Sequence, residues 1–69
     1  MNVNKLKGKV VEKGMTIAQF AKALGINKST IYRKFSADGL SIGEAQKAAE
    51  LLCLTADEAM AIFFPAYVA

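Results

Sequence analysis

The twenty residues TIAQFAKALGINKSTIYRKF, numbered 16–35, decide the fold that we predict for this chain. Thr16 and Gln19 form the Thr-x-x-Gln pattern of a capping box, whose side chains satisfy free N–H groups at a helix start. The residues that follow at the spacing of one helical face are apolar: Ile17, Phe20, Ala21 and Leu24. We therefore expect a helix over residues 17–24.

A second helix must begin almost at once, because only three residues separate the two apolar patterns. Gly25 suits the left-handed conformation that ends a helix, and Asn27 suits the capping position of the next one. Ile31 and Phe35 are the clear core positions of that next helix, which we expect over residues 28–36. Two helices joined by so short a turn form a helix-turn-helix.

The polar residues of the second helix lie where a core cannot use them. At about 100° per residue, Ser29 and Arg33 point directly away from Ile31. Tyr32 flanks this outward face, and Lys28 lies in the first turn, where its flexible stem can reach a neighbouring surface. All four outward side chains form hydrogen bonds, so we expect them to face a polar partner.

A helix held by one apolar edge, with a cationic outer face, suits the major groove of DNA, which is about 12 Å wide. The planar fork of Arg33 can donate to guanine O6 and N7 together, and serine and lysine can bond to base edges as well. Tyr32 could stack on a sugar or a thymine methyl group, or it could simply cover the edge of the core. The predicted base-reading residues are Lys28, Ser29, Tyr32 and Arg33.

Helical periodicity continues on both sides of this motif, and no segment alternates as a strand does. We expect a helix over residues 2–13, without a start signal of its own, and two more helices behind capping boxes at Ser41 and Thr55. The apolar positions assigned to the core in these helices are Val3, Leu6, Val10, Ile42, Ala45, Ala49, Leu52, Ala59, Met60 and Phe63. The prediction is an all-α, compact five-helix bundle that forms one domain over residues 1–69.

Composition excludes several classes of function. The chain has 69 residues, 54% of them hydrophobic, with no histidine and one cysteine. Without histidine it lacks the commonest general base and metal ligand, so we expect neither an enzyme nor a metal or cofactor site. Cys53 has no partner for an internal disulfide, and we expect it to be a small buried hydrophobe. With no secretory or membrane-spanning segment in view, we expect a cytoplasmic protein.

The net charge of +3 conceals a strong asymmetry along the chain. Residues 1–37 hold eight of the nine Lys and Arg residues and one acid, a net charge of +7. Residues 38–69 hold one lysine and five acids, a net charge of −4. A basic half that carries a compact helical motif favours a polyanionic partner, although a lysine-rich first helix that is merely solvated remains an alternative.

The segment GMTIAQFAKALGINKSTIYRKF resembles the helix-turn-helix of the Cro/CI-type phage repressor family, and SIGEAQKAAELLCLTADEAMAIFF resembles the two helices that complete its lambda-repressor-like domain. The most specific points are Ala21 at the helix crossing, Gly25 at the turn and Ile31 as the buried anchor. The resemblance implies phosphate contacts from the start of the first motif helix, and base contacts from the start of the second. The predicted phosphate-binding residues are Thr16, Gln19, Asn27, Lys9, Lys13, Lys22 and Lys34, of which Asn27 could equally be only a helix cap and the lysines only solvated.

The resemblance further implies a bacterial or phage-encoded transcriptional regulator, a repressor of the Cro kind, that binds double-stranded DNA. Such proteins usually bind palindromic operators as homodimers on half-sites about 34–36 Å apart. The candidate dimer interface, or alternatively plain core, comprises Phe63, Phe64, Tyr67 and Val68. The rival interpretation is a protein-binding helical adaptor or antirepressor that acts on another regulator. A lipid-surface binder is disfavoured, because the basic half is divided among short helices.

Overall fold

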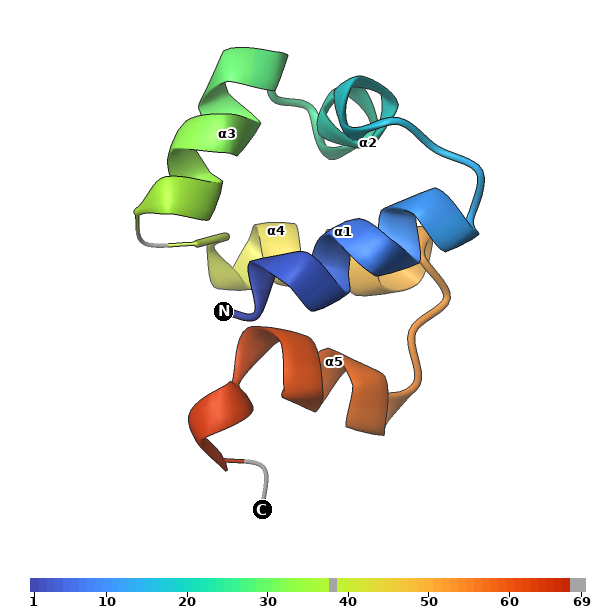
Figure 1. The fold of residues 1–69 in the computed structure, drawn as a ribbon, viewed down its shortest axis with the longest axis vertical. Coiled ribbons are helices and arrows are strands. Elements are labelled where there is room, and N and C mark those ends of the chain that lie inside the picture. The colour runs from blue at the N-terminus through green and yellow to red at the C-terminus, as the bar shows by residue number, and fades with distance from the viewer. Residues whose placement is uncertain (38, 68–69) are drawn as a thin grey trace.

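The computed structural model describes residues 1–37 and 39–67, and the regular structure of this part of the chain is entirely helical (Figure 1). It comprises α1 (Val3–Glu12), α2 (Ile17–Leu24), α3 (Lys28–Ser36), α4 (Ile42–Leu51), α5 (Ala56–Phe63) and a final 3₁₀ turn, η1 (Pro65–Tyr67). The all-α, five-helix prediction is confirmed. None of the helices so described is long and apolar enough to cross a membrane.

Each α-helix begins at a side-chain cap. The capping boxes predicted at Thr16, Ser41 and Thr55 are all formed, with both reciprocal hydrogen bonds present. The first helix also has a start signal, which sequence reasoning missed: the Asn2 side chain accepts a hydrogen bond from the Lys5 N–H at 3.1 Å. Local hydrogen bonding therefore defines where every α-helix begins.

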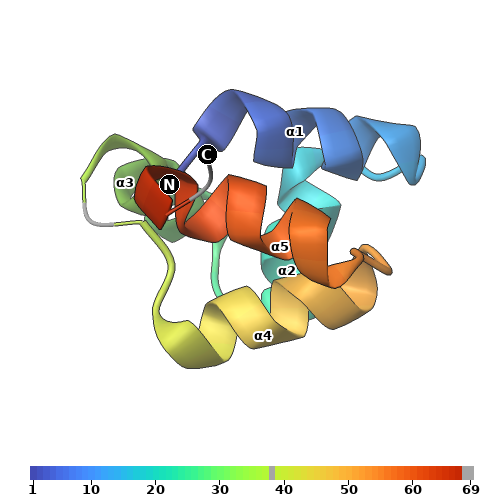
Figure 2. The same ribbon diagram turned by 90° about the horizontal axis from the view of Figure 1, so that it is seen from below.

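The helices enclose a small apolar core. Helices α2 and α3 lie at one end of the molecule and α5 at the other, while α1 and α4 cover opposite sides between them (Figures 1 and 2). The fully or nearly fully buried side chains are Leu6, Val10, Phe20, Ala21, Leu24, Ile31, Ala48, Leu52 and Ile62. The start of α1 is tied to the end of α5, because the Asn2 N–H donates to the Ile62 carbonyl at 2.7 Å.

The apolar faces predicted for α4 and α5 were partly wrong. Ile42 was assigned to the core but is 81% exposed, and Met60 is 41% exposed. Ala48 and Ile62 are fully buried instead. The reason is that α4 packs against α2 and α5 against α1, which turns the other apolar face of each helix toward the space between them.

The expectation that Cys53 is buried was also wrong, since its side chain is exposed. Cys53 has a φ of 51°, in the left-handed region, where the chain leaves α4. The next N–H, that of Leu54, donates to the Ala49 carbonyl at 3.0 Å and closes this turn. The turn directs Leu52 and Leu54 toward the core and leaves the cysteine between them facing solvent.

Candidate nucleic-acid interface

The turn between α2 and α3 sets how these helices cross. Gly25 has a φ of 83°, a left-handed conformation that favours glycine, and its N–H donates to the Lys22 carbonyl at 3.0 Å. Asn27 then caps α3, because its side-chain oxygen accepts from the Thr30 N–H and the Ser29 hydroxyl, both at 2.8 Å. This three-residue turn gives α3 its direction relative to α2.

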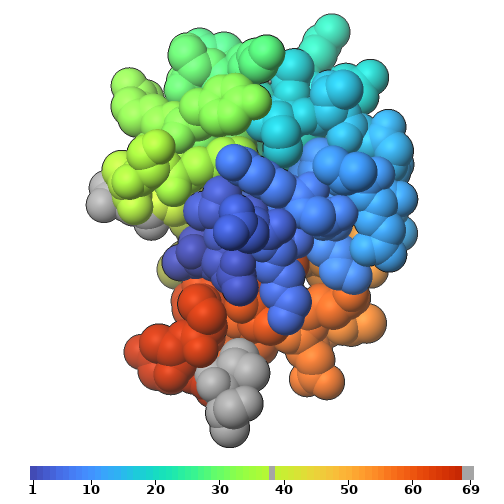
Figure 3. Space-filling view, in the orientation of Figure 1, coloured from blue at the N-terminus to red at the C-terminus, as the bar shows by residue number. Residues whose placement is uncertain are grey.

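Helix α3 has one apolar edge against the core and a polar outer face. As the helical wheel predicts, Ile31 is completely buried and Phe35 packs against the core, whereas Ser29 and Arg33 are exposed. Lys28 is exposed as well. Helix α3 lies beside α2 and above α1 on the surface seen in Figure 3. The four predicted base-reading residues therefore belong to one accessible helix, and their contacts with bases stay a prediction.

Tyr32 lies between the two roles that the sequence left open. Its side chain is 43% exposed, and its ring packs edge-on against Phe35 with 6.2 Å between the ring centroids.

The ammonium group of Lys7, on α1, lies 5.4 Å from the centre of the Phe35 ring on α3, a cation–π contact. Lys7 was not among the predicted site residues. The contact joins residues 28 positions apart, so no local sequence pattern could have indicated it.

The lysines predicted to bind phosphate fall into two groups. Lys9 contacts Glu12 at 3.3 Å and also pairs with Glu58 on α5, while Lys34 pairs with Glu44 at 3.1 Å. The remaining predicted lysines, Lys13 and Lys22, are exposed and form no ion pair with any residue that the structure describes.

The carboxylates of Glu58 and Glu44 have lowered pKa values. Hydrogen bonds from the Lys9 ammonium and from the Thr55 N–H lower the pKa of Glu58 to about 2, and the same pair raises the pKa of Lys9. A hydrogen bond from the Ser41 backbone N–H lowers the pKa of Glu44, and a hydrogen bond from the Lys34 ammonium lowers it further by a smaller amount. Both carboxylates are therefore ionised at neutral pH. They hold the ammonium groups of Lys9 and Lys34 in ion pairs with the acidic half of the chain.

Thr16 and Gln19 lie at the start of α2, both exposed and both already engaged in capping. The Gln19 N–H donates to the Thr16 hydroxyl oxygen at 3.1 Å, and the Thr16 N–H donates to the Gln19 side chain at 2.9 Å.

Among the described residues, no three acidic or cysteine side chains are grouped closely enough to hold a metal ion.

The comparisons with known proteins agree with this geometry. Residues 8–38, which run from within α1 to just past α3, match the family model described as the helix-turn-helix domain of resolvase. The comparisons with curated proteins and with solved structures found no match. The fold and the family match together support a helix-turn-helix DNA-binding family. They do not single out the Cro/CI-type repressors that the sequence resembles.

Proposed function

We propose that this protein is a sequence-specific transcriptional regulator of the Cro or repressor kind, which inserts α3 into the major groove of double-stranded DNA. The observation that carries the proposal is the division of α3: Ile31 is fully buried, while Ser29 and Arg33 on the opposite side are exposed. A helix fixed at one edge presents its other face rigidly, as base reading requires. The function needs no catalysis and no cofactor.

In this proposal the exposed face of α3 reads bases and the flanking residues fix its position. Arg33 would bind a guanine edge with two parallel hydrogen bonds, and Lys28 would bond to a guanine or a phosphate. The hydroxyl of Ser29 donates to Asn27 in the free protein, so it can still accept a hydrogen bond from a base while keeping the helix cap intact. Tyr32 would pack against the sugar or thymine surface beside them.

Phosphate contacts would come most readily from groups that are not held elsewhere. Lys13 and Lys22 are exposed and free of ion pairs within the described residues, whereas Lys9 and Lys34 would have to leave or share a carboxylate. Thr16 and Gln19, with Asn27, would contribute from the helix starts, where backbone N–H groups favour anions. These contacts add affinity and fix register but carry no sequence information.

Binding to a palindromic operator as a homodimer is part of the proposal. One copy measures 33 × 25 × 20 Å, so two copies can occupy half-sites about 34–36 Å apart without overlapping. A protein-binding adaptor is the second candidate. The net charge of +7 on residues 1–37 favours DNA over that alternative, because clustered positive charge attracts a polyanion.

A selection from random DNA followed by gel shift tests the proposal. Arg33→Ala should lose about 1–3 kcal/mol on the selected site and relax its sequence preference. Lys13→Ala, which removes one exposed cation from α1's end, is the matched control and should weaken all sequences alike, lowering the salt slope by about 0.9. Equal losses for Arg33→Ala on selected and random DNA would remove it from the reading face. If the protein retains no DNA from the pool and instead binds another protein with an affinity that does not depend on salt, the adaptor would be favoured.

A further inference from the structure

Lys7 on α1 is a half-buried lysine whose charge rests against α3. Its ammonium group stands over the Phe35 ring, 5.4 Å from the ring centre. Within the part of the chain that the structure describes, Lys7 forms no ion pair. Lys9, the other half-buried lysine of α1, instead has two carboxylate partners. The Phe35 ring is thus the partner that the fold gives to the charge of Lys7.

Helix α1 is a firm support for this ammonium group. Leu6, the neighbour of Lys7 in the chain, is fully buried, and so is Val10 one turn further on. At the start of the helix, the Asn2 N–H donates to the Ile62 carbonyl on α5 at 2.7 Å. Because the core and α5 hold α1 in place, a contact from Lys7 restricts the group that it touches.

The Phe35 ring is in turn the support of Tyr32. The two rings meet edge-on at an angle of 90°, with 6.2 Å between their centroids, an arrangement that aromatic pairs prefer. Tyr32 is 43% exposed, so its ring extends from this contact to the molecular surface. Lys7, Phe35 and Tyr32 therefore form a continuous series of contacts from α1 to the exposed side of α3.

The backbone of α3 is held independently of this series. Ile31 is fully buried in the core, and the Lys34 ammonium pairs with the Glu44 carboxylate on α4 at 3.1 Å. Removing the charge of Lys7 should therefore leave α3 in its place and free only the two rings. A freed tyrosine ring must be ordered again when it meets a partner, and that ordering lowers affinity.

We propose that Lys7, acting through the Phe35 ring, positions the Tyr32 ring for contact with DNA. The inference rests on the proposed function, because it assigns to Tyr32 the DNA-contacting one of the two roles that the sequence left open. Lys7 is a positioning residue here and need not touch DNA itself. A ring that is held in place before binding loses less freedom on a matching site, which sharpens the preference for the base pairs beside it.

The base preference at each position of a single half-site tests the inference. Tyr32→Ala first identifies the base pairs whose preference depends on the ring. Lys7→Gln and Phe35→Leu should each lower the preference at these same base pairs by about two- to tenfold, with the other positions unchanged. Lys7→Arg keeps a cation over the ring and should keep the preference. Lys7→Gln carries the test even if Phe35→Leu disturbs the fold.

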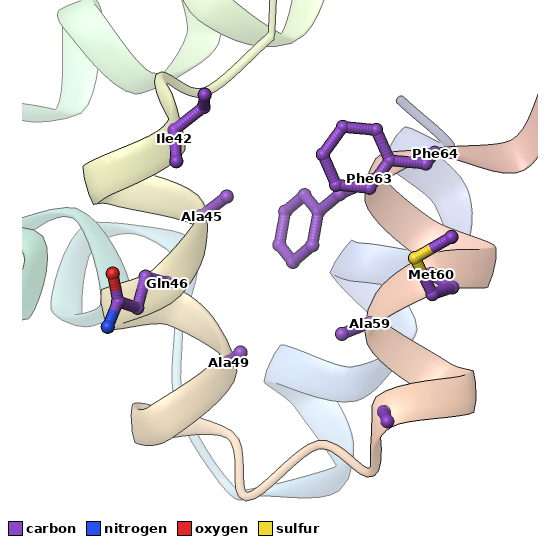
Figure 4. A pocket seen from close by; sticks show the side chains of 9 residues that line it. Ile42, Ala45, Gln46, Ala49, Ala59, Met60, Phe63 and Phe64 are labelled. Carbon is purple, nitrogen blue, oxygen red and sulfur yellow. The ribbon is translucent and has the colours of Figure 1, made fainter.

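Two matched controls separate positioning from lost charge and from lost packing. Lys5→Gln removes the same charge from an exposed position of α1 and should weaken all sequences alike. Phe63, like Phe35, packs partly against the core, but it lies on α5 beside the alanine-lined hollow between α4 and α5 (Figure 4). Phe63→Leu should therefore lower the stability of the fold and leave the base preference unchanged.

A single half-site also keeps the pairing of copies out of the comparison. This matters because Phe63 belongs to the dimer interface predicted from sequence. Of the other residues of that interface, Phe64 and Tyr67 are exposed, and Val68 lies outside the described residues.

Combining the substitutions shows whether Lys7 acts through Phe35. In a chain that already carries Phe35→Leu, Lys7→Gln should cause no further loss of preference. A further loss as large as in the unmodified chain would overturn the inference. Unchanged preferences in Lys7→Gln or in Tyr32→Ala would do the same, and so would a Lys7→Gln loss spread equally over all sequences, which marks a direct phosphate contact.

Failure of this inference is distinguishable from failure of the proposed function. An unmodified chain that binds no DNA would remove the regulator and the positioning role together. Sequence-specific binding by a chain whose preferences do not depend on Lys7 would remove the positioning role alone.

Discussion

Replacing Ile31 with alanine tests whether one buried side chain holds α3 on the domain. Ile31 is completely buried, and the substitution removes three carbon atoms, worth about 2.4 kcal/mol at about 0.8 kcal/mol for each buried CH₂. The cavity left behind adds to this loss, so we expect about 3 kcal/mol in total. A chain of this length is stable by only about 3–10 kcal/mol, so the variant should melt about 12–24 °C lower.

Ile42→Ala is the matched control, because it removes the same three carbons from the same residue type at an 81% exposed position. Its free energy of unfolding should change by about 0.5 kcal/mol or less. Thermal unfolding followed by circular dichroism, at protein concentrations low enough to keep the chain monomeric, measures both. If the two substitutions lower the melting temperature equally, Ile31 does not anchor α3, and the orientation of its polar face loses its physical basis.

The other predictions concern single local features. Because the pKa of Glu58 is about 2 in the folded protein against an ordinary 4.5, its carboxylate stabilises the fold above pH 4.5 and ceases to do so as the pH falls from 4.5 toward 2. Glu58→Gln should flatten that part of the curve of stability against pH, and an unchanged acid limb would mean that the pair with Lys9 is not formed in solution. Cys53→Gly should raise the free energy of unfolding, measured by urea denaturation, by about 0.5–1 kcal/mol, because it relieves a left-handed backbone that disfavours L-residues. A lower free energy of unfolding would show that the cysteine side chain contributes packing. Gly25→Ala should lose about 1–2 kcal/mol from its left-handed φ of 83° alone, since no atom of the described residues other than those of its chain neighbours lies within 4 Å of the added Cβ. Gly8→Ala, equally unobstructed but within α1, should instead gain about 0.5–1 kcal/mol, and equal effects at the two glycines would contradict this backbone explanation.

Features that depend on neighbours in the chain could be predicted from the sequence. The bounds of α2 and α3 agree with the expected residues 17–24 and 28–36, because capping boxes and a left-handed glycine act over four residues or fewer. The outward direction of Arg33 followed from the helical wheel alone, since α3 has just two apolar positions to bury.

Features that depend on residues distant in the chain could not be predicted from the sequence. The wheel of α5 has apolar residues on more than one side, so periodicity could not choose between Met60 and Ile62 for the core. Packing against α1 makes that choice and buries Ile62. The exposure of Cys53 has a similar origin, because the direction of the turn after α4 depends on where Leu52 and Leu54 find the core.

By itself, the sequence determined the helices, their starts, the helix-turn-helix and the cationic outer face of α3, because each depends on hydrogen bonds and periodicities within a few residues. Only the tertiary structure decided which lysines are held in ion pairs, which face of α5 is buried, and that α4 and α5 leave an alanine-lined hollow open. Those outcomes are set by contacts between segments tens of residues apart, for which the linear order of residues carries no local signal.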